Sequence, residues 1–185
     1  MENSIELTSK RKFSTQDIVK IGMLASVCML ATFIKVPVGT AMVHLGSAAL
    51  FTIGILFGGV YGGLAGAIGS ALYDIVGAYS AYTLWSFFIK GGAGFLVGFV
   101  ANHKFLLNFA KSKGQTGEII KNIIAIFVAG AWTLAGYLVA WSFVLGGFDK
   151  AVLNIPASLL SSGIGLIVAI PLTLALKKPL RKFLK

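Results

Sequence analysis

The sequence predicts an all-α, polytopic membrane protein with six transmembrane helices and both termini in the cytoplasm. Apolar runs recur along nearly the whole chain, and several reach the roughly 20 residues needed to cross a bilayer core. The 185 residues are 57% hydrophobic and 12% charged, which is atypical of a soluble domain. We expect one integral membrane domain over 1–185, with a basic segment at 1–13 and a basic tail at 177–185.

The first predicted helix runs from Asp17 to Ile34. A capping box marks its start, with Ser14 as N-cap and Asp17 three residues later. Pro37 and Gly39 exclude a helix from the loop that follows. The other five helices are expected at 48–57, 62–76, 82–100, 119–144 and 153–176. The second and third are short for complete crossings.

Lysine and arginine positions predict the orientation. The formal net charge of +10 does not indicate nucleic-acid binding, because the basic residues lie at the ends of apolar runs. With six crossings, the basic N-terminal segment, the 101–118 connector and the C-terminal tail share one face, which is then cytoplasmic. The opposite face carries only Lys35 and Lys150, and the single cysteine, Cys28, excludes an internal disulfide.

Small residues recur at four-residue spacing, as in Gly62, Gly66 and Ser70 or Gly94 and Gly98. In lipid, small residues let helices approach closely enough for van der Waals contact. One interpretation is packing inside the bundle. The other is a small-residue stripe that receives a partner protein, for which Gly22 and Ser26 in the first helix are the candidates.

Two opposite charges lie inside apolar runs, Asp74 in the third helix and Lys90 in the fourth. A charged side chain within the bilayer costs about 2.5–3.5 kcal/mol on insertion scales. The pair could form a structural salt bridge that fixes the two helices together. Alternatively, the charges face a cavity and orient a polar ligand, and both interpretations stay open at this point.

Aromatic and polar side chains occur at the same predicted depth. Thr133, Tyr137 and Trp141 follow each other at four-residue spacing and share one helix face. Interfacial Trp and Tyr are usually membrane-anchoring residues, but such rings also form the walls of ligand pockets. The other candidates for ligand contact are Tyr82, Trp85, His44 in the first outer loop, and Asn154, which could instead cap the last helix.

Catalytic and metal-binding signatures are absent from the sequence. No paired carboxylates, no Ser/His/Asp set, no metal-ligand spacing and no phosphate-binding glycine loop are found. We therefore expect no enzyme activity and no cofactor in this chain. Any energy from ATP must come from another chain, because no ATPase motif is present.

Several motifs together resemble one family of membrane proteins. These are His44-Leu45-Gly46, the segment from Gly69 to Asp74, and Lys90-Gly91 with Gly94. They are similar to the riboflavin-transporter-like branch of the substrate-binding S components of energy-coupling factor (ECF) transporters. The resemblance covers nearly the whole chain.

The resemblance implies capture of a water-soluble vitamin or precursor at the outer face of a bacterial cell membrane. It also implies docking on a transmembrane coupling subunit and two ATPases, which use ATP. The family docks through an A-x-x-x-A pattern on the first helix. This chain has Gly22-x-x-x-Ser26 instead, and Ala25 is followed four residues later by Met29.

Within that branch, importers of hydroxymethylpyrimidine or pyridoxine resemble the pattern best. One Lys, one Asp, one Asn and several aromatic residues suit a single small ring better than riboflavin. Two other functions remain open, a stand-alone secondary carrier coupled to protons through Asp74 and a scaffold that transports nothing.

Overall fold

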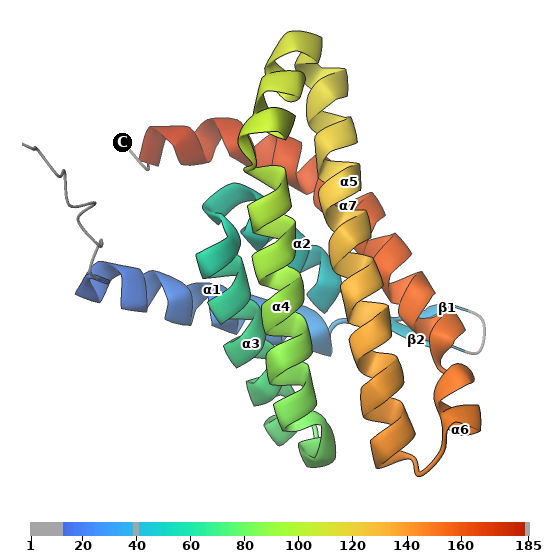
Figure 1. Ribbon diagram of the computed structural model, residues 1–185. Helices are drawn as coiled ribbons and strands as arrows, with labels where there is room; N and C mark the ends of the chain where they lie inside the picture. Colours follow the sequence, from blue (N-terminus) through green and yellow to red (C-terminus); the bar gives the residue numbers. More distant parts are fainter. Residues whose placement is uncertain (1–12, 39–40, 184–185) are drawn as a thin grey trace, which may run out of the picture.

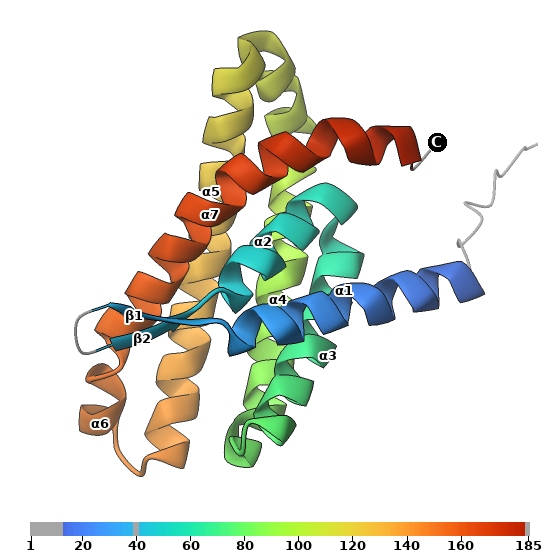
Figure 2. The same ribbon diagram turned by 180° about the vertical axis from the view of Figure 1, so that it is seen from behind.

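The computed structural model describes residues 13–38 and 41–183, and it is a bundle of helices with one small hairpin (Figures 1 and 2). Its elements, in chain order, are α1 (Thr15–Phe33), β1 (Lys35–Val38), β2 (Ala41–His44), α2 (Gly46–Phe57), α3 (Gly59–Val76), the 3₁₀ turn η1 (Ser80–Tyr82), α4 (Thr83–Ala101), α5 (Lys104–Val144), α6 (Phe148–Val152) and α7 (Ile155–Phe183). A helix thus lies at each of the six predicted places, although α2 is short and α5 begins earlier than predicted.

The start of α1 confirms the predicted capping box. The Asp17 amide donates to Ser14 Oγ at 3.3 Å, and the Ser14 amide donates to Asp17 Oδ2 at 3.0 Å. The hydroxyl of Tyr61 on α3 also donates to Asp17 Oδ1 at 2.5 Å. The same carboxylate therefore caps α1 and connects it to α3.

The loop after α1 is a two-stranded antiparallel hairpin. Its register pairs Lys35 with His44 and Val36 with Val43. The sequence excluded a helix here but did not predict strands, because Pro37 reads as a breaker. An edge position tolerates proline, since the amide that proline lacks is not needed there. The hairpin places His44 immediately before α2, and β2 also contacts α7.

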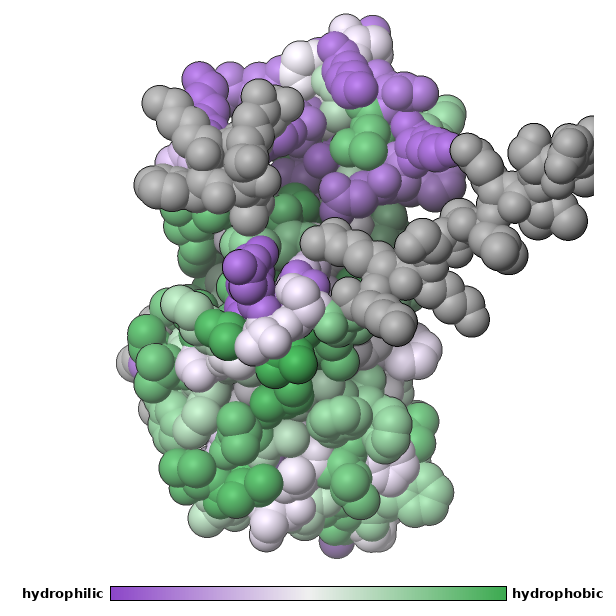
Figure 3. All heavy atoms as spheres, turned by 90° about the vertical axis from the view of Figure 1, so that its left-hand side faces the viewer, coloured by the Kyte–Doolittle hydropathy of each residue, from purple (hydrophilic) through white to green (hydrophobic). Residues whose placement is uncertain are grey.

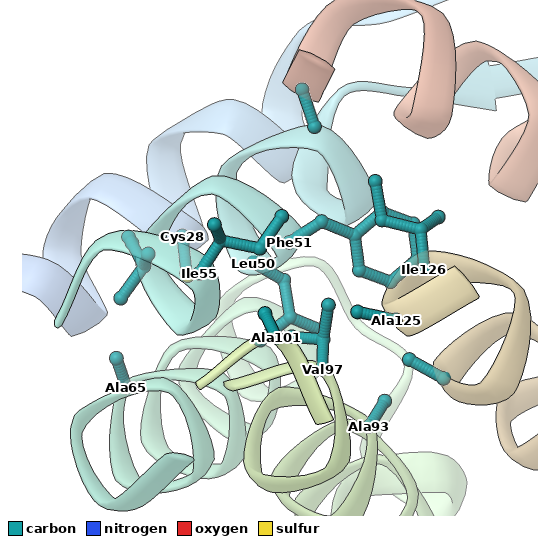
Figure 4. Close-up of a cluster of buried hydrophobic side chains, with 13 residues drawn as sticks. Cys28, Leu50, Phe51, Ile55, Ala65, Ala93, Val97, Ala101, Ala125 and Ile126 are labelled. Atoms are coloured by element: carbon teal, nitrogen blue, oxygen red, sulfur yellow. The ribbon is translucent and has the colours of Figure 1, made fainter. Parts of the chain in front are cut away.

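Helix α2 is the centre of the core. Its 12 residues rise about 18 Å, which is less than the roughly 30 Å of a bilayer core. Leu50 and Phe51 on it are 2% and 1% exposed. Figure 4 shows them among Val97 of α4 and Ile126 of α5. The helix is therefore buried by its neighbours, which explains an apolar run too short for a complete crossing.

Helices α3 and α4 pack closely through glycines. A Cβ on Gly94 would overlap the Gly62 carbonyl oxygen, and a Cβ on Gly59 would lie 2.7 Å from the Phe95 carbonyl oxygen. Gly58 adopts φ +92° at the corner between α2 and α3, which L side chains rarely adopt. The predicted use of small residues for bundle packing is confirmed for this pair.

Helix α5 is longer than predicted. It begins at Lys104 and not near Ile119, and it is broken at Gly114, where φ is 59° and ψ is −136°. The segment expected as a connector is thus helical on both sides of a sharp turn, which lies at the top of Figure 1. At the other end, the short α6 precedes α7, and Pro171 lies inside α7.

The outer surface fits a membrane environment. In Figure 3, hydrophobic residues cover the lower body of the molecule, and hydrophilic residues gather at the end that holds the turn of α5. Within the described part of the chain, four helical segments are long and apolar enough to cross a bilayer: 15–33, 80–101, 104–144 and 148–180. The number of six crossings and the cytoplasmic position of the termini stay predictions.

Candidate ligand-binding site

Three neighbouring cavities lie near the N-terminal end of α4, between the hairpin and helices α3, α5 and α7. Their volumes are about 50, 340 and 210 Å³. His44 and Tyr137 line all three, so the cavities converge on these two side chains. We call them the inner, mouth and α7 cavities in that order.

Asp74 and Lys90 are both buried and both line the inner cavity. They are 7% and 8% exposed. Although the structure describes both residues, it contains no ion pair between them. Lys90 Nζ donates to Ser47 Oγ at 3.3 Å and lies 5.5 Å from the centre of the Tyr137 ring. The geometry therefore favours charges that face a cavity over a closed salt bridge.

The Asp74 carboxylate has an unused acceptor. Its Oδ2 is buried and has no hydrogen-bond partner among the residues that the structure describes. Buried polar atoms are normally paired, because an unpaired one loses its hydration without compensation. An unpaired acceptor and a lysine in one cavity suit a ligand that carries both a donor and an acceptor.

Aromatic rings form one wall of the site. Tyr137 and Trp141 stack with ring centroids 5.4 Å apart, and both line the mouth and α7 cavities. Thr133, one turn earlier on α5, lines the α7 cavity, as their common helix face predicted. A hydrogen bond of 3.0 Å between the Tyr137 and Ser86 hydroxyls fixes the tyrosine ring. This wall can stack against a flat ring.

His44 enters the site from β2, outside the long helices. Its Nδ1 is buried without a hydrogen-bond partner in the described part of the chain. Burial, with the nearby charges of Lys90 and Lys35, lowers the pKa of His44 from 6.5 to about 3. The imidazole is therefore neutral at physiological pH and offers one donor and one acceptor.

Sequence reasoning missed three residues of the site, Lys35, Tyr73 and Ser86. Lys35 Nζ lies 5.9 Å and 5.5 Å from the ring centres of Tyr73 and Tyr79, at the mouth cavity. A hydrogen bond that the Lys35 ammonium donates to Tyr73 raises the pKa of this amine, which keeps it charged. Ser86 could have been found, because it lies one helical turn before Lys90 on the same face.

Two predicted residues do not line these cavities. Trp85 stacks on Phe143, with ring centroids 5.7 Å apart. Asn154 Nδ2 donates to the Lys150 carbonyl oxygen at 3.1 Å, so the amide joins the end of α6 to the start of α7. Tyr82 does line the mouth cavity, as predicted. Serines of α7, among them Ser161, complete the α7 cavity.

Comparison with known proteins identifies the family. Residues 12–178 match the family described as "ECF-type riboflavin transporter, S component". The chain belongs to this family. It is therefore an integral membrane protein and the substrate-binding subunit of an ECF transporter, a class of vitamin-uptake systems.

Individual relatives extend this similarity. An uncharacterized protein of Pyrococcus woesei is 30% identical over 145 residues, which are 78% of this chain and 88% of that protein. A UPF0397 protein of Enterococcus faecalis is 31% identical over 153 residues, covering 80% and 77% of the two chains.

Solved structures share the fold. ThiT from Listeria monocytogenes superposes with a TM-score of 0.63 at 21% identity, covering 86% of this chain and 92% of that one. The S component of a bacterial ECF transporter gives 0.60 at 20% identity, covering 91% and 96%.

In this S component, the predicted docking residues divide between two faces of α1. Gly22 and Ser26 are exposed, and nothing lies within 4 Å of a Cβ built on Gly22. Ala25 is only 1% exposed, and a Cβ on Gly69 of α3 would lie 2.5 Å from its carbonyl oxygen. Ala25 thus packs inside the bundle in this conformation, and the exposed face of α1 presents Gly22 and Ser26.

Proposed function

We propose that this S component binds one small, single-ring vitamin or precursor, with hydroxymethylpyrimidine and pyridoxine as the best candidates. The observation that carries the proposal is that Asp74 and Lys90 line one cavity without forming an ion pair and lie beside the aromatic wall of Tyr137 and Trp141. Keeping two unpaired charges at this depth is costly. A ligand that supplies a donor to Asp74 and an acceptor to Lys90 offsets that cost.

The size of the site supports a small ligand. Binding pockets for drug-sized molecules span roughly 300–1,000 Å³, and the mouth cavity, of about 340 Å³, is at the low end of this range. A flat ring stacked on Tyr137 reaches Asp74 and Lys90 through the inner cavity, with Tyr82 and His44 at its edge. Lys35 at the mouth attracts an anionic or electron-rich substituent.

Riboflavin is the second candidate, because the matching family is named for its transport. A three-ring flavin would need the mouth and α7 cavities to merge. Both are lined by His44, Tyr137 and Trp141, so a rotation of these side chains would join them.

The proposed partners are a transmembrane coupling subunit and two ATPase subunits in a bacterial cell membrane. We place the docking surface on the exposed face of α1, where Gly22 and Ser26 lie between Ile18, Met23 and Leu30, which are 63%, 66% and 63% exposed. Small residues within an apolar face allow close approach of a partner helix. ATP is hydrolysed by the partners, and no cofactor is needed in this chain.

The test is a thermal-shift panel on the protein purified in mild detergent, with hydroxymethylpyrimidine, pyridoxine, riboflavin and other vitamins. A tight ligand must raise the melting temperature by mass action. We expect one of the two single-ring compounds to do so, and the shift to disappear in Lys90→Ala. A shift with riboflavin alone would identify riboflavin as the substrate in place of a single-ring compound. No shift with any compound would contradict vitamin binding.

Two alternatives predict different results. A stand-alone carrier coupled to protons through Asp74 would take up the vitamin into liposomes that hold this protein alone. The proposal instead expects uptake only when the partner subunits are present. A scaffold would show strong coupling between Asp74→Asn and Lys90→Met in stability, with binding unchanged. We expect weak coupling in stability, since the two groups form no ion pair.

A further inference from the structure

A fourth cavity lies at the opposite end of the bundle from the proposed vitamin site. It has a volume of about 150 Å³ and is bounded by α2, α4, α5 and α7. Asn102, the C-cap of α4, lines it, whereas Ser86 in α4 lines the vitamin site, and their separation of 16 positions corresponds to about 24 Å along a helix. We call it the lysine cavity, because Lys121 and Lys177 line it.

The lysine cavity has one polar and one apolar wall. The polar wall is formed by Asn102, Glu118, Lys121, Thr173 and Lys177. The apolar wall is formed by Ile55, Leu56, Leu107 and Leu180. A cavity divided in this way suits an amphiphilic molecule, whose head group and hydrocarbon chain need different surroundings.

One buried polar group that lines this cavity, and one that follows a lining residue in the chain, lack hydrogen-bond partners in the described part of the chain. Thr173 is 1% exposed, and its hydroxyl has no hydrogen-bond partner among the described residues. Asn122, which follows Lys121 in α5, is 0% exposed, and neither atom of its amide is paired with any residue that the structure describes. Because such groups are nearly always satisfied, a bound molecule at Thr173 is expected.

The charges at this cavity favour an anion. Lys121 Nζ and Lys177 Nζ both contact Glu118, at 3.0 Å and 2.6 Å. One carboxylate cannot neutralise two ammonium groups, so one positive charge remains. The surrounding segments add basic residues in the sequence, including Lys104, Lys111 and Lys178, and Figure 3 shows hydrophilic residues gathered at this end.

We propose that the lysine cavity binds the phosphate head group of an anionic membrane lipid. Phosphate oxygens accept hydrogen bonds from the ammonium groups of Lys121 and Lys177 and from the Thr173 hydroxyl, and charge-assisted bonds of this kind are strong. The acyl chain lies along the apolar wall. Basic pockets between transmembrane helices are known to recognise anionic head groups in this way.

The test compares lipids and variants by thermal shift and by native mass spectrometry of the full-length protein in neutral detergent. Phosphatidylglycerol is titrated against phosphatidylcholine and against inorganic phosphate. We expect phosphatidylglycerol to stabilise and to stay bound, with at least tenfold higher affinity than phosphatidylcholine. If inorganic phosphate stabilised the protein as much as phosphatidylglycerol does, the lipid proposal would be overturned, and the cavity would be a site for free anions.

Three variants distinguish lipid binding from a purely structural role, in which the ion pair only holds α5 and α7 together. Lys177→Gln should weaken phosphatidylglycerol binding at least fivefold, whereas Glu118→Gln should keep or increase it, because it removes a competing anion. Lys178→Gln, an exposed neighbour outside the cavity, should change it less than twofold. Equal losses in Lys177→Gln and Glu118→Gln, or equal affinity for both lipids, would overturn the proposal.

Discussion

Two buried lysines in this molecule have opposite surroundings. Lys121 on α5 contacts Glu118 at 3.0 Å, and the same carboxylate contacts Lys177 on α7. Lys90 on α4 is equally buried, but its amine has a serine hydroxyl and the face of a tyrosine ring as neighbours and no carboxylate contact among the described residues. The two residues are 3% and 8% exposed, so burial does not distinguish them.

The difference indicates which lysine has a carboxylate partner within the chain and which lacks one and is available to the vitamin. A buried charge that lacks a partner is costly, and a stable bundle gains nothing from it unless another molecule completes the interaction. Lys121 has a carboxylate partner one turn earlier in its own helix, and Lys177 connects the same carboxylate to α7. Lys90 and Asp74 face the same cavity, and each can still form a hydrogen bond to a ligand. The following experiments test this contrast.

The largest effect is expected from Lys90→Ala. Loss of the amine should weaken vitamin binding by about 100-fold or more, which corresponds to about 3 kcal/mol, because no other cation lines the inner cavity among the described residues. Isothermal titration of the detergent-solubilised protein measures it. Lys121→Met is the matched control and should bind the vitamin normally. Equal losses in both variants would contradict the contrast.

For stability, a larger effect is expected from substitution of Lys121 than from substitution of Lys90. Lys121→Met should lower the free energy of unfolding by about 2 kcal/mol, less than the 3–5 kcal/mol of a fully broken buried pair, because Lys177 still contacts Glu118. Thermal denaturation without ligand measures the change. Lys90→Met should be neutral or stabilising in the same assay, and a larger loss for Lys90→Met would identify Lys90 as the structural residue.

Asp74→Asn should separate stability from binding. Removing an unpaired buried charge should raise the melting temperature of the ligand-free protein, and the loss of one charged acceptor should weaken the vitamin about tenfold, or about 1.4 kcal/mol. Melting and titration of one preparation give both values. Normal vitamin binding by Asp74→Asn would show that the Asp74 carboxylate does not contact the ligand.

Acidification should destabilise the protein through His44. Because burial lowers its folded pKa to about 3 from 6.5, the unfolded state binds more protons between these values. Stability is therefore complete above pH 6.5 and falls as pH decreases towards 3, by at most about 1.4 kcal/mol per pH unit. Melting temperatures measured from pH 7 to 5 should depend less on pH in His44→Gln than in the unmodified protein. The exposed control His103→Gln should keep the full pH dependence.

The smallest effect is expected from Asn154→Ala. The sequence pattern predicts a lost ligand contact, but the amide donates to the Lys150 carbonyl oxygen at the α6–α7 junction. From this geometry we expect vitamin affinity to change less than about threefold, within the range of one neutral hydrogen bond. A loss as large as that of Lys90→Ala would return Asn154 to the binding site.

Much of the fold could be predicted because its signals are local. The capping box of Ser14 and Asp17, the apolar runs and the four-residue spacing of glycines each act within one helix or between sequence neighbours. The hairpin could not be predicted, since two four-residue strands around Pro37 carry little periodicity. The helical part before Gly114 was missed because its lysines read as a connector.

The site was predicted only in part for a related reason. Lys90, Asp74, Tyr137, Trp141, Tyr82 and His44 stand out as unusual residues in apolar or loop segments, and all of them line the cavities. Lys35 looks ordinary in the sequence, and only its neighbours in space distinguish it, whereas the position of Ser86 one turn before Lys90 was a signal that went unused. Trp85 and Asn154 look as promising as the others, but their side chains contact Phe143 and the Lys150 carbonyl.

The sequence by itself determined the membrane class, the places of the long helices and the two charges that need an explanation, because hydropathy and spacing are properties of the chain. Only the tertiary structure decided that Asp74 and Lys90 form no ion pair and that Lys177 of α7 contacts Glu118 of α5. Whether two charges pair depends on how helices rotate and approach, and glycine contacts between α3 and α4 fix that rotation across residues far apart in the chain.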